Sequence, residues 1–391
     1  MQKRLSINFI VPKLKEYKFS GGIYCILKYA DGLAKKGHLV NVIPHIGSKK
    51  PKWIDCSASF MLCTKERLLG HSVNSTVKNI VNWLDKKLYR GKNVFSQRAI
   101  KLDYMHYAIP DADITIATAW DTAEIVYRFG KGEKAYFAQH FEPVFFETES
   151  YEKMLCEWSY QLPLKKIANS TWLKQKIENY LEKHGIDDTV YKCVNAVDSD
   201  IFKKIPVEDF RENPGHVKII SYGGQKLRWK GFEEMAQGIA IAREKLPDYN
   251  IDWLVYGSAV LLPDNPIAEY THLGFLQSRN LALAYNKCDI LLSASWYESF
   301  PLFPIEAMAC GLAAITTKYG TEDYAIHGFN AEIVEERNPY SIGEGIIKLV
   351  TDKEYREKLS HNGYATAQNF NWSSSVNNME QVLFKILNKK H

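Results

Sequence analysis

Residues Asp289–Thr317 read D-I-L-L-S-A-S-W-Y-E-S-F-P-L-F-P-I-E-A-M-A-C-G-L-A-A-I-T-T, and this stretch decides the fold. It opens with an apolar run of the kind that forms a buried parallel strand. Pro304 suits the first turn of a helix, where its missing N–H is not needed, and Gly311 ends that helix. A second apolar run follows. The order of strand, loop, helix and strand is typical of an open α/β sheet.

The loop in this stretch carries Glu298, and Glu306 follows eight positions later. In an open α/β sheet, ligands bind where such loops leave the carboxyl ends of the strands. The N–H groups around Ser299 to Phe303 and the positive end of the helix dipole favour a phosphate group, and the two carboxylates can accept hydrogen bonds from sugar hydroxyls. Together they favour a sugar nucleotide. In a simpler interpretation, Glu306 is an ordinary first-turn acid and Glu298 a solvated loop residue.

The composition is that of a globular chain of 391 residues, with 46% apolar and 24% charged residues, long enough for two domains. There is no run of about eighteen uncharged apolar residues, and M-Q-K-R-L-S-I-N-F-I-V-P leads directly into a strand pattern. We therefore expect a soluble, cytoplasmic protein. The net charge of +5 is mild and does not indicate nucleic acid as a partner.

The seven cysteines are scattered and form no C-x-x-C pair, which predicts buried reduced thiols rather than disulfides or a metal site. They are Cys25, Cys56, Cys63, Cys156, Cys193, Cys288 and Cys310.

The N-terminal half begins with an apolar strand pattern at Ile7 to Val11 and the pair Gly21-Gly22, followed by apolar residues at helical spacing. This is a βαβ pattern without G-x-G-x-x-G, so a nicotinamide cofactor is weakly indicated. Gly21 and Gly22 either let the backbone approach a ligand or form a turn with positive φ.

Residues 48–110 show few clean periods. Within them, residues 83–98 form a basic, aromatic segment, W-L-D-K-K-L-Y-R-G-K-N-V-F-S-Q-R. Such a segment can rest on anionic lipid headgroups as a peripheral membrane contact. It can equally be the solvated face of a helix.

A strand predicted at Lys134 to Gln139 ends in Q-H-F-E-P. At that position His140 could orient a substrate hydroxyl or stabilise a developing charge, and Glu142 is close enough in sequence to influence it. A purely structural histidine is the alternative.

The second half restarts the pattern with a strand at Val217 to Tyr222, the loop G-G-Q-K-L-R-W-K-G at 223–231 and a helix over 232–246. Lys230, directly before a glycine, could act as a point charge on phosphate. The alternative is an ordinary surface lysine. A further strand is expected at Leu273 to Phe275.

The loop E-S-F-P-L-F-P-I-E-A-M-A-C-G resembles the signature of retaining glycosyltransferases of family 4, E-G-F-G-L-x-x-x-E-A-M-A-x-G. The loop at 223–231 resembles that family's G-R-x-x-x-x-K-G, and V-N-A-V-D-S-D-I-F resembles V-x-N-G-V-D-x-x-x-F. Serine and proline replace the two glycines of the signature at Ser299 and Pro301. Gln225 stands where the family has arginine, so the second cation of the phosphate clamp is either missing or supplied by Arg228.

The resemblance implies roles for particular residues. The catalytic residues would be His140, Lys230 and Glu298. The donor would be held by Gly21, Gly22, Gln225, Arg228, Ser299, Phe300, Leu302 and Glu306, with Glu306 on the ribose. No metal and no cofactor are implied, because the cations of the clamp hold the diphosphate.

The resemblance also implies the GT-B fold, in which two Rossmann-like domains face each other across a cleft. The first domain would span residues 1–205 and the second, nucleotide-sugar-binding domain 206–371, with a C-terminal helix in 372–391 crossing back onto the first domain. The implied reaction is retaining transfer of a sugar from a nucleoside-diphosphate donor to a glycan or lipid-linked acceptor in cell-surface polysaccharide assembly, rhamnosyl transfer from a dTDP donor included.

Two other function classes stay open. One is a catalytically silent nucleotide-sugar binding protein, because Gln225 and Pro301 weaken the usual clamp. The other is a nicotinamide-dependent enzyme, which would need a glycine fingerprint that this chain lacks.

Overall fold

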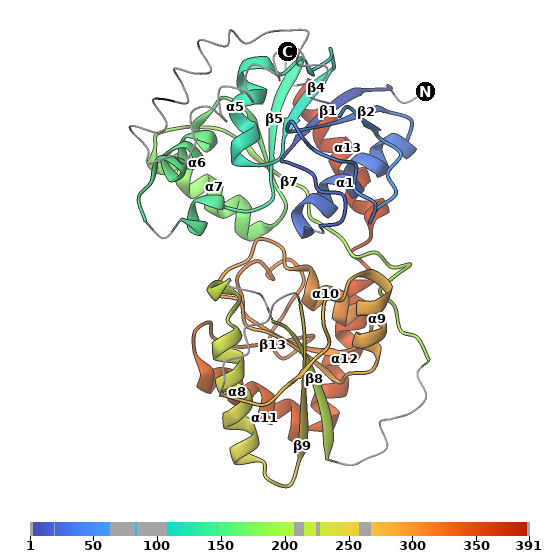
Figure 1. Cartoon of the computed structure of the whole chain (residues 1–391), viewed down its shortest axis with the longest axis vertical. Coiled ribbons are helices and arrows are strands. Elements are labelled where there is room, and N and C mark those ends of the chain that lie inside the picture. Colours follow the sequence, from blue (N-terminus) through green and yellow to red (C-terminus); the bar gives the residue numbers. More distant parts are fainter. Residues whose placement is uncertain are drawn as a thin grey trace. The chain divides into compact units, whose positions relative to one another are not determined.

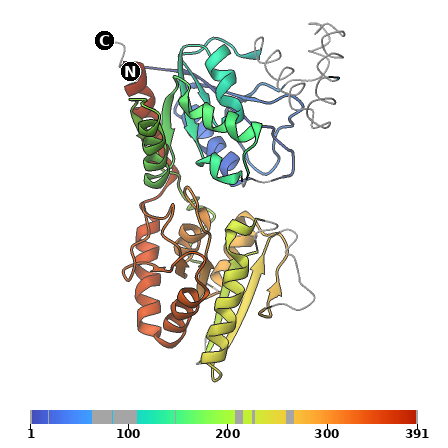
Figure 2. The same cartoon turned by 90° about the vertical axis from the view of Figure 1, so that its left-hand side faces the viewer.

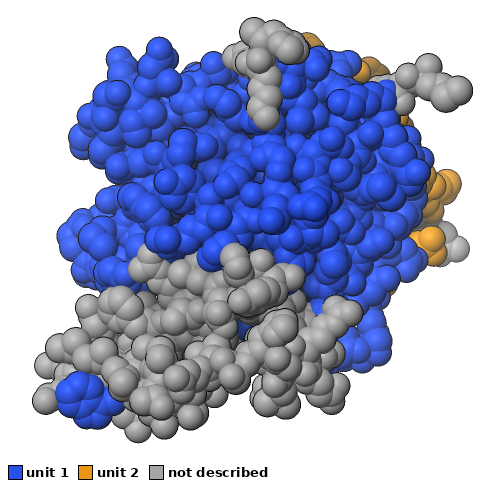
Figure 3. Space-filling view, turned by 90° about the horizontal axis from the view of Figure 1, so that it is seen from above, with its two compact units in different colours: residues 1–169, 173–193, 375–391 blue, residues 170–172, 194–374 orange. Residues whose placement is uncertain are grey.

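The computed structural model of the chain describes residues 3–18, 20–62, 83, 108–146, 148–206, 215–223, 227–257 and 267–388. The chain divides into two compact units, coloured separately in Figure 3. Unit 1 comprises residues 1–169, 173–193 and 375–391, and unit 2 comprises residues 170–172 and 194–374.

Unit 1 is built on a parallel sheet with the strand order β3-β2-β1-β4-β5-β6-β7. The strands are β1 (Ser6–Val11), β2 (Leu39–Pro44), β3 (Ser59–Phe60), β4 (Ile114–Ala117), β5 (Glu133–Ala138), β6 (Lys165–Ala168) and β7 (Val190–Lys192). The central strands β1 and β4 are almost fully buried. A parallel sheet covered on both faces requires such continuous apolar runs, which is why these strands were readable in the sequence.

The helices of unit 1 are α1 (Gly21–Lys35), α5 (Trp120–Phe129), α6 (Tyr151–Gln161), most of α7 (Thr171–Lys183) and most of α13 (Trp372–Asn388), with the short 3-10 helix η1 (Glu142–Phe145). Helix α13 lies beside α1 (Figure 1). In α13, Oε1 of Glu380 lies 2.8 Å from Nε2 of His38, and its Oε2 lies 2.7 Å from Nζ of Lys36. The C-terminal helix therefore returns to the first domain, as the sequence predicted.

Unit 2 holds a second parallel sheet, in the order β10-β9-β8-β11-β12-β13. Its strands are β8 (His216–Tyr222), β9 (Asn250–Tyr256), β10 (Thr271–His272), β11 (Ile290–Ser293), β12 (Ala313–Thr316) and β13 (Glu332–Ile333). From β8 the chain proceeds to β9 on one side, and from β11 it proceeds to β12 on the other. The neighbours β8 and β11 thus form the topological switch point, where open α/β sheets bind ligands.

Helices cover both faces of this second sheet. They are α8 (Phe232–Lys245), α9 (Ser278–Asn286), α10 (Leu302–Ala309), α11 (Pro339–Thr351) and α12 (Lys353–Ala367), with the 3-10 helix η2 (Arg228–Lys230). Successive strand residues alternate between two cores: Ile219 packs with α8 and α11, and Ile220 packs with α9 and α10. Figure 2 shows α8 running alongside β9, where Phe232 stacks on Trp253 with ring centroids 5.3 Å apart.

The structure corrects three expectations. The strand expected at Leu273 to Phe275 lies earlier, at β10, and the Phe275 side chain is exposed. Gly21 and Gly22 open helix α1 without positive φ, so the turn interpretation is wrong. The segment 194–205, assigned to the first domain, belongs to unit 2 because Val197 pairs with Asn371 and Phe202 packs near Tyr285.

The cysteine prediction agrees with the structure where it can be compared. Six of the seven lie in the described ranges, all six are free thiols, and five of them are buried. Cys63 lies outside those ranges.

Candidate functional site

Lys230 and Glu298, 68 positions apart in the sequence, form an ion pair through Nζ and Oε1. Lys230 ends η2 in the loop after β8, and Glu298 lies in the loop after β11. Because β8 and β11 are neighbours in a parallel sheet, their following loops leave the same edge. Both side chains are mostly buried, with 15% and 12% exposure, so their charges interact more strongly than a surface pair would.

A hydrogen bond, a ring stack and a close backbone approach hold these two loops together. The N–H of Trp296 donates to the carbonyl oxygen of Trp229 at 2.8 Å. The rings of Trp229 and Tyr297 stack with centroids 5.5 Å apart and an interplanar angle of 12°. Gly231 has φ +70, and a Cβ there would lie 2.1 Å from the carbonyl oxygen of Ala294. The glycine after Lys230 is therefore required both by its dihedral angle and by the close approach of β11.

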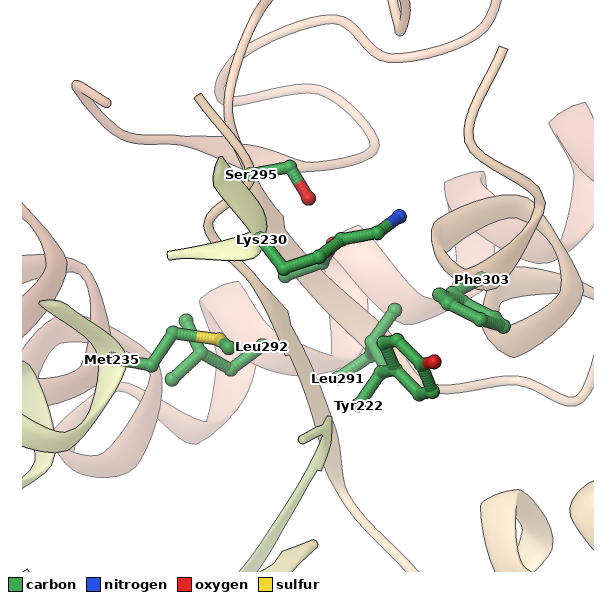
Figure 4. Close-up of a pocket in the computed structure, with 8 residues that line it drawn as sticks. Tyr222, Lys230, Met235, Leu291, Leu292, Ser295 and Phe303 are labelled. Carbon is green, nitrogen blue, oxygen red and sulfur yellow. The ribbon is translucent and has the colours of Figure 1, made fainter. Parts of the chain in front are cut away.

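The ammonium group of Lys230 lies among three aromatic rings. Nζ is 4.3 Å from the ring centroid of Trp229, 5.7 Å from Phe303 and 5.8 Å from Tyr222. These rings orient the lysine by cation–π attraction while leaving its N–H donors to oxygen partners. In Figure 4 the Lys230 side chain extends across a pocket toward Phe303. The pocket is lined by Tyr222, Lys230, Met235, Leu291, Leu292, Ser293, Ser295 and Phe303.

The backbone of Glu298 is supported from behind by Gly320. This glycine has φ +81, and a Cβ there would lie 2.5 Å from the carbonyl oxygen of Glu298 and 2.8 Å from that of Ser299. Gly320 was not identified from the sequence, because nothing in a single glycine in a loop indicates which backbone it faces.

Helix α10 begins at Leu302, with Pro301 as its N-cap residue and Pro304 in its first turn. The Tyr324 hydroxyl donates to the Pro301 carbonyl at 2.8 Å and fixes the entry to the helix. The N–H groups of the first turn are free of helical partners, apart from the one that Pro304 lacks. The Phe300 side chain packs into the core against Tyr324, so only its backbone can face a ligand.

Glu306 lies in α10 with only 7% of its surface exposed. Burial raises the pKa of this carboxyl to about 8, with a smaller contribution from the charge of Asp198. Its carboxyl group forms no hydrogen bond or ion pair with any residue that the structure describes. A buried carboxyl without a donor is costly, and two vicinal hydroxyls would satisfy it.

In unit 1, Gly22 and the segment leading to His140 meet at the carboxyl edge of the sheet. A Cβ on Gly22 would lie 3.6 Å from the Cβ of Gln139, the residue before His140, whereas a Cβ on Gly21 would meet open space. The His140 ring packs on Phe145 with centroids 4.4 Å apart. The Tyr160 hydroxyl donates to the His140 carbonyl at 2.8 Å.

Glu142 has a structural role at the same edge. Its Oε2 accepts hydrogen bonds from the Trp120 N–H and the Tyr136 hydroxyl, both at 2.8 Å, and so fixes the start of α5. Burial raises its pKa to about 8, although both hydrogen bonds favour the charged form. The predicted influence on His140 is thus indirect, since Glu142 holds the loop that carries His140.

Gln225 lies outside the described residues, and so does the basic, aromatic segment 83–98 except for Trp83. Arg228 is described, and its guanidinium carbon lies 5.7 Å from the ring centroid of Trp296. Sequence reasoning missed Arg337, whose guanidinium carbon lies 4.0 Å from the same centroid.

Comparisons with known proteins match the part of the chain that carries this site. Residues 209–366 match the family model described as glycosyl transferases group 1. This match contains Lys230, Glu298 and Glu306, and thus the elements of unit 2 that form the switch-point site.

Two curated relatives have names that refer to the biosynthesis of O-antigen or capsular polysaccharide. The O-antigen biosynthesis protein RfbC of Myxococcus xanthus is 26% identical over 290 residues, covering 72% of this chain and 21% of that protein. The capsular polysaccharide biosynthesis glycosyltransferase CapM of Staphylococcus aureus is 32% identical over 221 residues, covering 52% of this chain and 56% of that protein. The chain thus spans only part of the length of these two relatives.

Among solved structures, Anabaena Alr3699/HepE in complex with UDP and glucose aligns with a TM-score of 0.68 at 15% identity, covering 97% of this chain and 99% of that one. Because it covers 97% of the chain, this alignment extends over both units. The chain has the GT-B fold. In sequence, the likeness to group 1 glycosyl transferases covers residues 209–366, and the two curated relatives are similar over part of their own length.

None of the helices in the described ranges combines the length and the apolar character needed to cross a membrane.

Proposed function

We propose that this protein is a retaining glycosyltransferase that moves a sugar from a nucleoside-diphosphate donor to an acceptor hydroxyl. One observation carries the proposal. At the switch point of unit 2, a mostly buried lysine, an acidic loop, a helix N-terminus and a buried unpaired carboxyl lie along one sheet edge. These are the groups that a diphosphate, a sugar and a ribose require.

Glu306 would accept hydrogen bonds from the ribose hydroxyls, which supply the donors that its carboxyl lacks. Lys230 and the first N–H groups of α10 would hold the diphosphate, and Glu298 would accept a hydroxyl of the donor sugar. Lys230 and Glu298 pair with each other in the structure. In the complex, Lys230 would therefore contact both the diphosphate and Glu298. Glu298 would also accept a hydrogen bond from a hydroxyl of the sugar.

In the chemical step, the bond between the anomeric carbon and the diphosphate oxygen breaks while the acceptor oxygen bonds to the anomeric carbon from the same face. The acceptor proton passes to the departing phosphate oxygen, so no protein base is needed. Negative charge grows on that phosphate as the bond breaks. Lys230 is already oriented by its three aromatic neighbours and would stabilise this charge without reorganising. Since the clamp is cationic, the proposal includes no metal.

The acceptor would be bound by unit 1, where Gly21 and Gly22 leave the backbone open and His140 stands at the end of β5. His140 would orient the acceptor hydroxyl or the sugar being transferred. We propose a glycan or lipid-linked acceptor in cell-surface polysaccharide assembly, as the names of RfbC and CapM suggest. A cytoplasmic protein with a peripheral membrane contact through segment 83–98 would fit such an acceptor.

The test is turnover of Lys230→Ala with a panel of nucleotide-sugars that includes UDP-glucose and dTDP-rhamnose. Loss of one preorganised charge should lower kcat by about a hundredfold or more. Lys245→Ala is the matched control, since it also removes one positive charge but lies at the end of α8, in an exposed pair with Glu344. A rate for Lys230→Ala within a few-fold of wild type would contradict the assignment.

The anomeric configuration of the product, read by NMR at early times, tests retention separately. An inverted product would exclude the same-face step and would leave the donor site intact. A wild-type protein that binds nucleotide-sugars but neither transfers nor slowly hydrolyses them would instead favour the catalytically silent binding protein.

A further inference from the structure

Two arginines from different loops share the indole ring of Trp296. Arg228 follows β8 and Arg337 follows β13, while Trp296 follows β11, so all three loops leave the carboxyl ends of strands in one sheet. The guanidinium carbons lie 5.7 Å and 4.0 Å from the ring centroid. Both arginine side chains are exposed, and neither forms a salt bridge or hydrogen bond with a residue that the structure describes.

Two hydrogen bonds fix the position of Trp296. Trp296 Nε1 donates to Oε1 of Glu234 at 3.0 Å, and its backbone N–H donates to Trp229 at 2.8 Å. The carboxylate of Glu234 therefore sits on the indole N–H, while Glu335 accepts from the side chain of Asn338 at 2.8 Å. Glu234 and Glu335 thus have partners other than the two guanidinium groups.

The backbone of Arg337 is itself unusual. Arg337 has φ +57, and Ser278 is the other non-glycine residue with positive φ in the described part of the chain. A long side chain in the left-handed region costs conformational energy, and glycine would adopt that region freely. The backbone conformation of the turn therefore does not explain why arginine stands at this position. Residues strained in this way often have a function, which points to the arginine side chain.

We propose that Arg228 and Arg337, which both lie against the Trp296 ring, bind a phosphate group of a substrate. Two like charges near one ring repel each other, and an anion that contacts both would offset this repulsion. A phosphate has enough oxygens to meet two guanidinium forks, whereas a single fork already satisfies a carboxylate. If the phosphate is the donor's, the pair would supply a cation at the clamp, where Gln225 stands in place of arginine. Whether the phosphate belongs to the donor diphosphate or to a phosphorylated acceptor rests on the proposed function, but the anion site itself does not.

The experiment is calorimetric titration of the full chain with inorganic pyrophosphate, for wild type, Arg337→Gly, Arg337→Lys and Arg228→Ala. Arg337→Gly should bind pyrophosphate about tenfold more weakly or worse, the usual effect of losing one charged hydrogen-bonding partner. Arg337→Lys keeps the positive charge but loses the two parallel N–H donors of the guanidinium group. Its affinity for pyrophosphate should lie between those of wild type and Arg337→Gly. Lys245→Ala, the control for net charge, should bind as wild type does.

Melting temperature separates a binding role from a structural one. Arg337→Gly relieves the left-handed strain, so it should melt at a higher temperature than wild type while binding less. If Arg337 served only to cover Trp296, the variant would melt lower and bind pyrophosphate normally, and the proposal would be wrong. Wild-type protein that binds no pyrophosphate would also overturn it.

A second titration, with UDP present at saturation, identifies the source of the phosphate. If the pair serves the donor, UDP abolishes the pyrophosphate signal and Arg337→Gly weakens UDP as well. If it serves an acceptor, pyrophosphate still binds beside UDP and Arg337→Gly weakens only pyrophosphate. Failure of wild type to bind any nucleoside diphosphate would contradict the proposed function, while the pyrophosphate comparison would still decide the anion site.

Discussion

At the residue scale, Glu306 is a charge whose protonation depends on its ligand. A carboxyl with a pKa near 8 is mostly protonated at neutral pH, and ionising it inside the fold is unfavourable. The sign follows from linkage. The unfolded chain ionises this group near pH 4.5 and the folded chain near 8, so the free protein loses stability as pH rises through this window. Hydroxyl donors would favour the ionised form and lower the pKa.

We therefore expect nucleoside diphosphate affinity to rise with pH between about 6.5 and 8.5, because proton release accompanies binding below the free pKa. Titration in two buffers of different ionisation enthalpy measures the released proton. Glu306→Gln keeps the shape but cannot ionise, so its affinity should be lower at pH 8.5 and should not follow this rise. An equal pH profile in both proteins would show that Glu306 does not contact the ribose.

Gly320 offers a second test at this scale, because its Cβ position is filled by the backbone of Glu298. Gly320→Ala should lower both the melting temperature and turnover. Gly274→Ala is a matched control, since Gly274 has φ +74 and open space at its Cβ position. Both variants suffer left-handed strain of about 1–2 kcal/mol, but only Gly320→Ala adds a clash of about 1–3 kcal/mol. Equal melting temperatures would contradict the close approach.

At the element scale, the return of α13 to unit 1 depends on a small residue in α1. A Cβ on Gly32 would lie 2.4 Å from Cγ2 of Val376, and the helices therefore touch where α1 has no side chain. Along α13, Val376, Met379, Leu383 and Ile386 are buried on one face. The spacing of these residues is helical, whereas nothing in the sequence indicates which position of α1 they pack against.

Gly32→Ala should destabilise the protein by about 1–3 kcal/mol, even though alanine is the better helix former, because overpacking exceeds the gain in propensity. Val376→Ala should also destabilise, by leaving a cavity. The double variant Gly32→Ala, Val376→Ala should lose less stability than the sum of the two, because the new methyl group occupies part of the space that valine vacated. Chemical denaturation of the four proteins measures this coupling, and strict additivity would mean that the two residues do not meet.

At the scale of the whole molecule, the candidate donor groups Lys230, Glu298 and Glu306 all belong to unit 2, while Gly21, Gly22 and His140 belong to unit 1. Each unit has its own sheet and its own core, so a ligand held by one unit should stabilise that unit most. A ligand at a hundred times its dissociation constant adds about 2.7 kcal/mol to the state that binds it.

Hydrogen exchange with and without a saturating nucleoside diphosphate should therefore show protection of residues 227–231 and 298–306, with little change in β1 and β4 of unit 1. A matched sample of Glu306→Gln at the same ligand concentration should show less protection. Equal protection of the start of α1 would place the diphosphate on Gly21 and Gly22 and would contradict a donor site confined to unit 2.

The sequence determined most elements because buried parallel strands are continuous apolar runs and their helices have a period of 3.6. The strands at Ile7 to Val11, Lys134 to Gln139 and Val217 to Tyr222 lie within a residue of their predicted bounds. A glycine with positive φ follows the end of a helix where predicted, at Gly311. Weakly periodic or exposed pieces, such as β10, were misplaced because nothing apolar fixes their register.

For the site, the sequence supplied the residue types and the spacing of Glu298 and Glu306, as well as the lysine before Gly231. Only the tertiary structure decided that Lys230 pairs with Glu298, that Gly320 supports Glu298, and that Arg228 and Arg337 meet on Trp296. The physical reason is that local pattern reflects burial and backbone conformation along one segment, whereas these contacts join loops from strands that become neighbours only when the sheet assembles.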